Sequence, residues 1–419
     1  MTKRKNKTHN TPAKILVVGI GGGGINAVNH MIACGMQGVE FVAVDTDKQQ
    51  LLLSKVQNCI QIGENLTEGL DAGNYSEFGQ KAAEESRDLL IEQMQGSDMV
   101  FITTGMGGNT GTGAAFIVAE YARKAGAVTV GVAAIPFSFE GKRRMNQAVA
   151  GIMNLMEHVD ALITVSYDRL LQIIDRRTSV QEAFHIADEV MRRGIQGITD
   201  LLLPNLISAD FVDVKSILAH AGVAGLGIGT ARGKNGAQAA AEAAVKSPLL
   251  EASIEGDLGV LFNITGGEDL TLDDVRDVAN IITEAVDPDA NIIFGAIIDK
   301  KLAKDEVQVT IIPVKHTNIS KSKDVPIYAP KRAVCANCKE HYYKGDKYCR
   351  FCGAPMGEPY HVDAIIAPIY GPPPVKRVHT CTKCGYTWKT KKMIDKECYC
   401  PKCGGDAPVS SIDDTWWKK

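Results

Sequence analysis

One stretch decides the fold of this chain: Thr103-Thr104-Gly105-Met106-Gly107-Gly108-Asn109-Thr110-Gly111-Thr112-Gly113. It follows the apolar run 99–102 and precedes a helix-like segment that begins at Ala114. A strand that ends in glycines and opens into a helix presents unpaired backbone N–H groups at the positive end of the helix dipole, where phosphate binds readily. A tight turn would need only the positive φ that glycine allows. Five glycines interleaved with threonine hydroxyls exceed that need, so the stretch predicts a phosphate-binding loop.

Apolar segments around this loop alternate with helix-like segments. Strands are expected at 14–20, 41–44, 59–62, 99–102, 127–135 and 161–165. Helices are expected after the glycines 21–24 through Ala33, across 77–95, from the loop to Lys124, and after Phe139. This alternation is typical of an α/β fold with a Rossmann-like parallel sheet covered on both faces. Such sheets bind ligands at the carboxyl ends of their strands, where the glycines lie.

A long helix is expected next. Ser179 and Glu182 form a capping box, and Pro204 marks the end. A helix of about 24 residues would span about 36 Å and could join two domains as a central spine. Its expected apolar face consists of Val180, Phe184, Ala187, Met191, Ile195, Ile198 and Leu202.

The segment 222–314 predicts a smaller α+β domain. Strands are expected at 225–230, 260–265, 292–298 and 307–314, and helices at 237–245 and 272–285. From His316 to Arg332 the sequence is rich in Lys, Ser and Pro, which is typical of a linker.

Charge and composition separate an acidic body from a basic tail. Residues 316–419 hold 18 Lys and Arg against 10 Asp and Glu, whereas residues 1–315 hold 28 against 39. Nine of the eleven cysteines and all three tryptophans follow residue 334. No apolar run reaches the ~18 residues that a bilayer span needs, and residues 1–12 are polar without an apolar signal core. We therefore expect a cytoplasmic protein with no transmembrane segment and a disordered N-terminus.

The first glycine cluster admits another interpretation. Gly19, Gly21 and Gly24 fit Gly-x-Gly-x-x-Gly after a strand, and the acidic Asp45 follows about 20 residues later, as in dinucleotide-binding folds. A nicotinamide- or flavin-dependent oxidoreductase is therefore an alternative. The pattern is weakly specific, however, and such a fold has no use for the second, richer loop at 103–113. A Gly-x-x-x-x-Gly-Lys-[Ser/Thr] motif is absent from the sequence.

The segment Gly107-Gly108-Asn109-Thr110-Gly111-Thr112-Gly113 resembles the tubulin/FtsZ signature, Gly-Gly-Gly-Thr-Gly-Thr-Gly, with asparagine at its third position. Further segments resemble bacterial and archaeal FtsZ in the same order: 19–27, 43–47, 137–144, 210–214 and 247–250. The resemblance covers most of residues 13–314. It implies a GTPase domain at 13–203, including the central helix, and an FtsZ/tubulin-type α+β domain at 204–315.

The resemblance implies GTP or GDP, with Mg²⁺, on the first domain. Matching positions assign to the phosphate loops Gly22, Gly23, Gly24, Ile25, Asn26, Asn109, Thr110 and Gly111. Glu140 and Arg144 match contacts to the ribose and phosphate side, and Asp188 matches a guanine contact. A carboxylate can accept from both guanine N1–H and the exocyclic amine, which adenine does not offer. The alternatives are a solvated carboxylate for Asp188 and an exposed helical pair for Glu140 and Arg144.

The resemblance also implies that Asp210 and Asp213 are catalytic residues that activate the water attacking the γ-phosphate. The alternative is that they cap a short helix. About 15 helical residues, roughly 22 Å, separate Asp188 from Pro204, so these acids can serve only a neighbouring subunit's nucleotide. A head-to-tail contact of this kind propagates a filament. We expect GTP-dependent homopolymers, with hydrolysis that requires assembly. The resemblance to FtsZ alone implies a role in cell division and septum formation.

Three residues depart from the family pattern. Asn109 replaces a glycine beside the phosphates, although asparagine tolerates positive φ. Ser208 and Tyr167 stand where the family usually has asparagine. Slow hydrolysis is therefore an open alternative, and the protein would then be a GTP-binding cytoskeletal scaffold.

The tail contains two four-cysteine sets, each made of two Cys-x-x-Cys knuckles: Cys335, Cys338, Cys349 and Cys352, then Cys381, Cys384, Cys400 and Cys403. Gaps of ten and fifteen residues between the knuckles are typical of zinc ribbons. Disulfides are the alternative, but they suit secreted proteins. Four thiolates around each Zn²⁺ would make both sites closed and structural, with Cys398 left as a spare.

We expect the tail to comprise a linker at 316–333, a double zinc ribbon at 334–404 and a terminal segment at 405–419. The ribbons stand where FtsZ usually has a disordered linker and a short apolar peptide for membrane tethers. The net charge of +8 over about a hundred residues is a modest field for nucleic acid, which stays possible. A protein partner is favoured.

Overall fold

The computed structural model describes residues 13–69, 76–175, 177–250 and 259–314, and the backbone of five short strands beyond residue 331. The chain divides into two units, residues 1–329 and 330–419, each of which is described by itself. The expected boundaries inside the first unit, at residues 203 and 315, stay predictions.

A parallel sheet forms the first part of unit 1, in the order β6-β5-β4-β1-β2-β3. All of its neighbouring strands pair in parallel, as the sequence predicted. The strands are β1 Ile15–Ile20, β2 Glu40–Asp45, β3 Asn58–Gln61, β4 Met99–Gly105, β5 Val128–Ile135 and β6 Ala161–Ser166.

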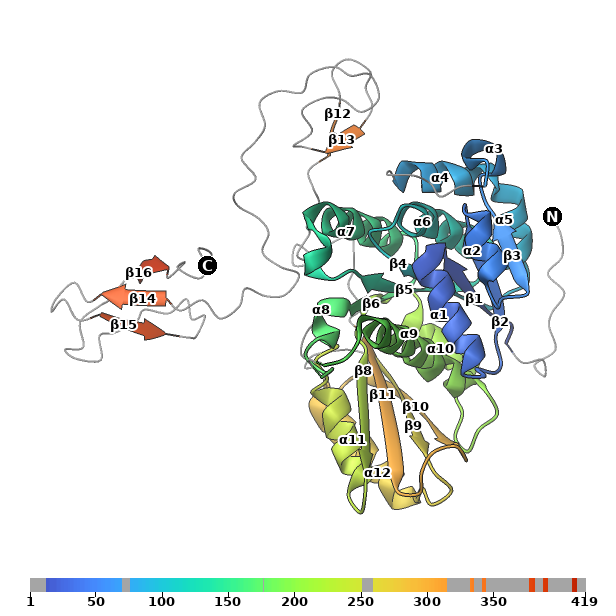
Figure 1. The fold of residues 1–419 in the computed structure, drawn as a ribbon. Helices are drawn as coiled ribbons and strands as arrows, with labels where there is room; N and C mark the ends of the chain where they lie inside the picture. Colours follow the sequence, from blue (N-terminus) through green and yellow to red (C-terminus); the bar gives the residue numbers. More distant parts are fainter. Residues whose placement is uncertain are drawn as a thin grey trace. The chain divides into compact units, whose positions relative to one another are not determined.

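Helices cover both faces of this sheet (Figure 1). They are α1 Gly21–Ala33, α2 Lys48–Leu53, α3 Glu64–Thr67, α4 Ser76–Glu85, α5 Arg87–Met94, α6 Asn109–Lys124, η1 Ser138–Glu140, α7 Lys142–Met156 and α8 Tyr167–Leu170. Alternate strand residues enter two separate cores, because neighbouring side chains on a strand point to opposite faces. Val17 belongs to the core beside α1, whereas Leu16 and Val18 belong to the core beside α4 to α7.

The single helix expected across 77–95 is two helices, so that prediction was wrong. The break lies at Ser86, whose backbone leaves the helical region with φ −92° and ψ 21°. Its hydroxyl accepts a hydrogen bond from Gly63 N at 3.0 Å, which ties the break to the segment after β3. A tertiary contact of this kind is not visible in the periodicity of the sequence.

Helix α9 (Val180–Leu202) is the expected central helix, and Figure 1 shows it between the parallel sheet and the remaining strands of the unit. Ser179 caps it by accepting a hydrogen bond from Glu182 N at 3.2 Å. The predicted apolar face is buried from Ala187 to Ile198, but Val180 is 74% and Phe184 42% exposed. The first turns of α9 therefore project beyond the core.

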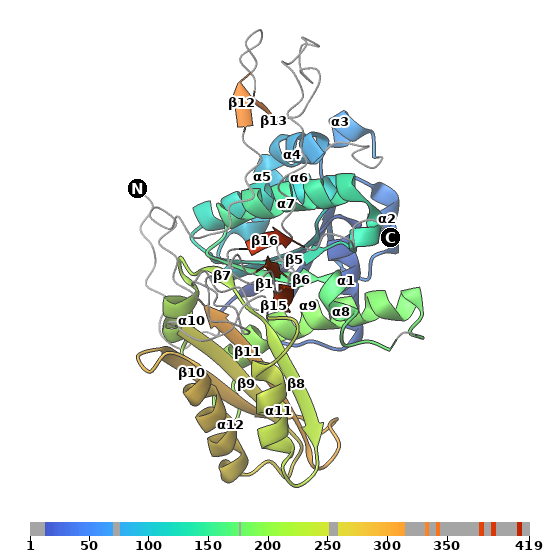
Figure 2. The same cartoon turned by 90° about the vertical axis from the view of Figure 1, so that its left-hand side faces the viewer.

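The second part of unit 1 continues the same sheet through β7 (Gly222–Ala224), which pairs with β6 and β11. Its other elements are β8 Gly227–Arg232, α11 Gly236–Val245, β9 Gly259–Gly266, α12 Leu272–Ala285, β10 Asn291–Ile298 and β11 Glu306–Val314. The four expected strands and two expected helices are present, and β7 is additional. Figure 2 shows α11 and α12 side by side on one face. α9 packs against the other face, so both parts share this helix.

In unit 2 the structure describes two small antiparallel sheets. β12 (Arg332–Val334) pairs with β13 (His341–Tyr343), and β14 (Arg377–Thr380) pairs with β15 (Thr387–Thr390) and β16 (Val409–Ile412). The N-terminal residues 1–12 and most of the expected linker and terminal segment lie outside the described residues. Within the described residues, none of the helices is both long and apolar enough to span a bilayer.

Candidate functional site

The two glycine loops meet at one edge of the sheet. β1 and β4 are parallel neighbours with Ile20 opposite Thr104, so their carboxyl ends lie side by side. The chain then enters α1 at Gly21 and α6 at Asn109. Neither helix has an acidic residue in its first turn or a side-chain cap, so the first N–H groups of both helices are unpaired within the helix. This edge is suited to an anion.

Backbone contact between the loops explains why glycine is required there. A Cβ on Gly21, where φ is +69°, would lie 2.8 Å from Gly111 N, and one on Gly24 would lie 2.3 Å from Thr103 O. A Cβ on Gly22 would meet no atom within 4 Å. Gly22 therefore faces open space beside two closely packed loops, as a phosphate cradle requires.

Threonine hydroxyls hold this arrangement from within. Thr46 Oγ1 and Thr110 Oγ1 are 2.8 Å apart, and Thr112 Oγ1 accepts from Gly107 N at 2.9 Å. The buried Asp45 carboxylate accepts from Thr46 N at 2.7 Å and from Asp47 N at 3.3 Å. These turn contacts give Asp45 a structural role that needs no dinucleotide ribose.

The expected phosphate-loop residues lie together at this edge, but they differ in exposure. Gly23 and Asn26 are exposed and Gly22 is half-buried. Ile25 is only 2% exposed and packs into the core beside α1, so its side chain does not face a ligand.

Glu140 and Arg144 form an ion pair, with 2.8 Å between Arg144 Nε and Glu140 Oε2. Glu140 also accepts from Phe137 N at 2.8 Å, which fixes the short η1 turn. The alternative interpretation, a mutual pair four residues apart, is therefore present in this structure. It leaves Arg144 half-exposed, with its guanidinium accessible to a ligand.

Asp188 of α9 lies half-buried, and burial raises the pKa of its carboxyl to about 7. Burial also raises the pKa of Tyr167, with smaller contributions from the charges of Asp188 and Glu140. Tyr167 therefore lies near both the carboxyl expected to bind the base and the residue expected near the ribose. The structure brings these predicted residues together around one aromatic side chain.

Phe184 is a residue that the sequence analysis placed in the core. It lies one turn before Asp188, is 42% exposed, and makes edge contacts with Phe137 and Tyr167 at centroid distances of 5.9 and 5.8 Å. An exposed ring beside a carboxyl group can stack on a planar base. The i, i+4 spacing to Asp188 was the available signal, but the apolar periodicity of the helix concealed it.

Asp210 and Asp213 lie elsewhere, beyond the carboxyl end of α9. Asp210 is the N-cap of α10 (Phe211–Leu218), since its Oδ1 accepts from Val212 N at 2.9 Å, and Asp213 lies in the first turn. Both are exposed. Helix α9 rises about 21 Å over the 14 residue steps from Asp188 to Leu202, so these acids are not part of the phosphate edge of the same chain. Capping, the alternative interpretation, holds for Asp210.

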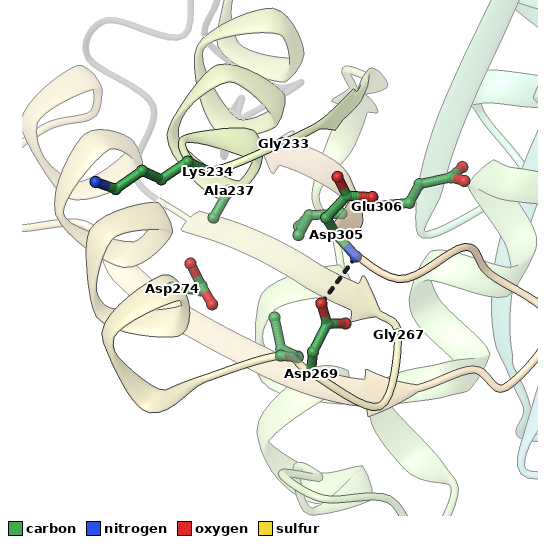
Figure 3. A pocket seen from close by; sticks show the side chains of 10 residues that line it. Gly233, Lys234, Ala237, Gly267, Asp269, Asp274, Asp305 and Glu306 are labelled. Carbon is green, nitrogen blue, oxygen red and sulfur yellow. Dashed lines mark hydrogen bonds between the residues drawn. The ribbon is translucent and has the colours of Figure 1, made fainter.

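A pocket of about 170 Å³ lies at the far end of the second part of the unit (Figure 3). Three of the four acidic side chains that line it have partners in the structure. Asp269 accepts from Asp305 N at 2.8 Å, and Glu306 binds Arg232 at 2.7 Å. Asp274 accepts from the hydroxyl of Thr271 and caps α12. These three carboxylates stabilise a turn, a helix start and a pair of neighbouring strands, and the pocket is remote from the phosphate edge.

His30, Cys34 and Glu189 bring three potential metal-ligating atoms within 4.8 Å of one another. Burial alone would raise the pKa of Glu189, but hydrogen bonds from Arg192 and Arg193 lower it to about 2. Both Glu189 oxygens accept from guanidinium groups at 2.6 to 2.8 Å. Two adjacent positive charges make this cluster an ion-pair network that disfavours a metal. The eight cysteines expected to bind zinc lie outside the described residues.

Comparison with known proteins agrees with this geometry. The GTPase domain of the Tubulin/FtsZ family matches residues 14–175, and the C-terminal domain of the FtsZ family matches residues 222–316. An empty FtsZ dimer from M. jannaschii is 41% identical, with a TM-score of 0.70 over 73% of this chain and 89% of that chain.

Two more distant structures share the fold. A GTPγS-bound protofilament of CetZ2 from Haloferax volcanii is 20% identical with a TM-score of 0.60, over 73% of this chain and 94% of that chain. A GDP-bound monomer of CetZ1 from the same organism is 21% identical with a TM-score of 0.61, over 73% and 95%. The matches span both parts of unit 1, which disfavours the oxidoreductase alternative. The chain belongs to the tubulin/FtsZ family and is a GTPase.

Proposed function

We propose that this GTPase assembles head to tail into GTP-dependent filaments and hydrolyses GTP at a site that two subunits share. The observation that carries the proposal is the placement of the two predicted half-sites. The phosphate edge lies at one end of the molecule's first part, and Asp210 and Asp213 lie past the other end of α9. We assign the nucleotide, with Mg²⁺, to the first half-site and water activation to the second.

The surface around the second half-site supports docking on another copy. Leu206 is 62% and Val212 66% exposed, on either side of Asp210, and Ile298 at the end of β10 is 41% exposed. Backbone hydrogen bonds between Ile207 and Ala296, at 3.0 and 3.1 Å, hold the loop against β10. A fixed loop with exposed apolar side chains is suited to a rigid interface. The FtsZ dimer and the CetZ2 protofilament show that related chains associate.

Light scattering and phosphate release, recorded together after GTP addition, test this proposal. We expect scattering to rise first and phosphate release to depend steeply on protein concentration. Hydrolysis at full rate below the assembly threshold would contradict the shared site. Scattering without phosphate would identify a scaffold, the outcome to which Ser208 in the loop would contribute.

We propose further that the tail is a double zinc ribbon that recruits a protein partner. β12 and β13 pair with Val334 opposite His341, so they enclose the six residues that contain Cys335 and Cys338. β14 and β15 pair with Thr380 opposite Thr387, and they enclose the six residues that contain Cys381 and Cys384. A knuckle between two antiparallel strands, repeated with the same length, supports structural Zn²⁺ sites.

Metal analysis of the purified protein tests the ribbons. We expect two Zn²⁺ per chain, and one after Cys381→Ser and Cys384→Ser are combined. Full metal content in that variant would contradict the second site. A role in cell division at the septum is part of this proposal and rests on family membership. Localisation of a fluorescent fusion in dividing cells tests it.

A further inference from the structure

The side chain of Asn109 stands where the family signature has glycine, at the first residue of α6. Helix α7 packs directly against this loop. A Cβ on Gly107, where φ is +89°, would lie 2.9 Å from the Arg144 carbonyl oxygen. One turn further along α7, Gln147 Nε2 donates to Gly108 O at 3.1 Å and to Asn109 Oδ1 at 3.3 Å.

These two contacts determine how both amides are oriented. Gly108 O can only accept, so the amide group of Gln147 that faces it is the nitrogen. The second N–H of that nitrogen then selects the oxygen of Asn109, since a rotated Asn109 amide would place two donors against each other. Gln147 thus holds Asn109 Oδ1 toward α7, and the Asn109 nitrogen points in a different direction from the oxygen.

We propose that Gln147 is a positioning residue for nucleotide binding, which keeps the amide oxygen of Asn109 away from the phosphates. An amide oxygen turned toward the phosphate edge would face an anion and be repelled, whereas N–H groups are compatible with it. The two hydrogen bonds from Gln147 to Gly108 O and Asn109 Oδ1 are called the clamp below. The clamp lets this chain tolerate a side chain at a position where the family signature has none. The inference rests on the proposed assignment of the 107–113 loop to the phosphates.

Nucleotide release from four proteins tests the clamp: wild type, Gln147→Leu, Asn109→Gly and the double variant. A fluorescent N-methylanthraniloyl analogue of GDP is chased with excess GDP below the assembly threshold. We expect Gln147→Leu to accelerate release on the order of tenfold, the value of one or two lost hydrogen bonds. In the Asn109→Gly background the same change should alter release by less than about twofold, because no amide remains to be oriented.

Asn146→Leu is the matched control, the same amide-to-leucine change at an exposed neighbour on α7. It should release the analogue at the wild-type rate. If Gln147→Leu does not fold, Gln147→Glu keeps the side-chain shape and replaces the donor by a carboxylate. Gln147→Glu should also release the analogue faster than wild type, and adding Asn109→Gly to it should reverse part of this acceleration.

Equal acceleration in the wild-type and Asn109→Gly backgrounds would overturn the inference, because Gln147 would then act on the loop without the Asn109 amide. Release of the analogue from Gln147→Leu at the wild-type rate would overturn it as well. A wild-type protein that binds no analogue at all would instead refute the proposed function.

Discussion

Two aspartates of α9 have raised pKa values for the same reason, but their positions give them different consequences. Burial raises the pKa of both Asp188 and Asp200 to about 7. Asp188 lies beside the exposed ring of Phe184, where a base can displace water. Asp200 is 9% exposed in the last turn of the helix, against Asn263 of β9.

The raised pKa of Asp188 predicts that nucleotide binding depends on pH. Only the carboxylate can accept from both guanine donors, so protonation below pH 7 must be reversed before the base binds. Affinity for GDP should fall as pH decreases, by up to about tenfold per unit from pH 7 to pH 5.5. Titration calorimetry across this range measures the slope. Asp188→Asn should flatten it, and an unchanged slope in that variant would show that another group controls binding.

The raised pKa of Asp200 predicts that its negative charge destabilises the folded state. The raised pKa means that the folded state holds the proton more tightly than the unfolded state, where the ordinary value is 3.8. The contribution of Asp200 to the free energy of unfolding is fully present below about pH 4 and is lost as pH rises to about 7. This loss is at most about 4 kcal/mol. Asp200→Asn should therefore raise the free energy of unfolding at pH 8 by about 1 to 3 kcal/mol, with little change at pH 4.

Urea unfolding at the two pH values measures this difference. Asp160→Asn is a useful contrast, because that buried carboxylate accepts from both N–H and O–H of Thr129 at 2.9 Å. Loss of its charge should lower stability at pH 8. A stabilisation by both variants would mean that buried charge in general, and not the setting of Asp200, decides the sign.

At the scale of elements, the signature glycines serve different contacts. A Cβ on Gly113 would lie 1.9 Å from Ser76 O, because α4 crosses α6 at that point. Gly113→Ala should force the two helices apart and lower the free energy of unfolding by about 1 to 3 kcal/mol, net of alanine's better helix propensity. Urea unfolding of the nucleotide-free protein measures the loss.

Gly22→Ala should show the opposite pattern. Its Cβ would meet no protein atom within 4 Å, so stability should be retained while GDP affinity falls. If Gly113→Ala instead weakened binding without loss of stability, the phosphate loop would extend further into α6 than proposed.

Local patterns predicted most of these elements, since each expected strand of the parallel sheet formed and the ends of α9 lie within two residues of their signals. The failures have tertiary causes. The predicted helix is interrupted at Ser86, whose hydroxyl accepts a hydrogen bond from Gly63 N. Phe184 lies on the apolar face of α9 but is exposed, because the first turns of the helix extend past the sheet. The clamp from Gln147 joins residues 38 positions apart, a contact that no spacing rule indicates.

At the scale of the molecule, α9 separates the proposed guanine and phosphate half-site from the proposed catalytic loop, so under the proposal each chain depends on a neighbour. Filament growth then places one intact loop on each nucleotide, except at the filament end. Variants that damage different half-sites should therefore complement each other. Asp213→Ala keeps the nucleotide pocket, and Asp188→Ala keeps the loop.

Each variant alone should hydrolyse GTP at least about 100-fold more slowly than wild type, the usual value of a lost proton acceptor or binding group. In an equal mixture, half of the subunits carry an intact loop and half carry an intact pocket. About one in four contacts between successive subunits then joins an intact loop to an intact pocket, so the rate should recover to about a quarter of wild type. Phosphate release from the mixture measures this recovery, and pelleting confirms that both variants enter the polymer. Activity equal to the sum of the separate variants, with both in the pellet, would show that each subunit completes its own site and that the separation along α9 is bridged within one chain.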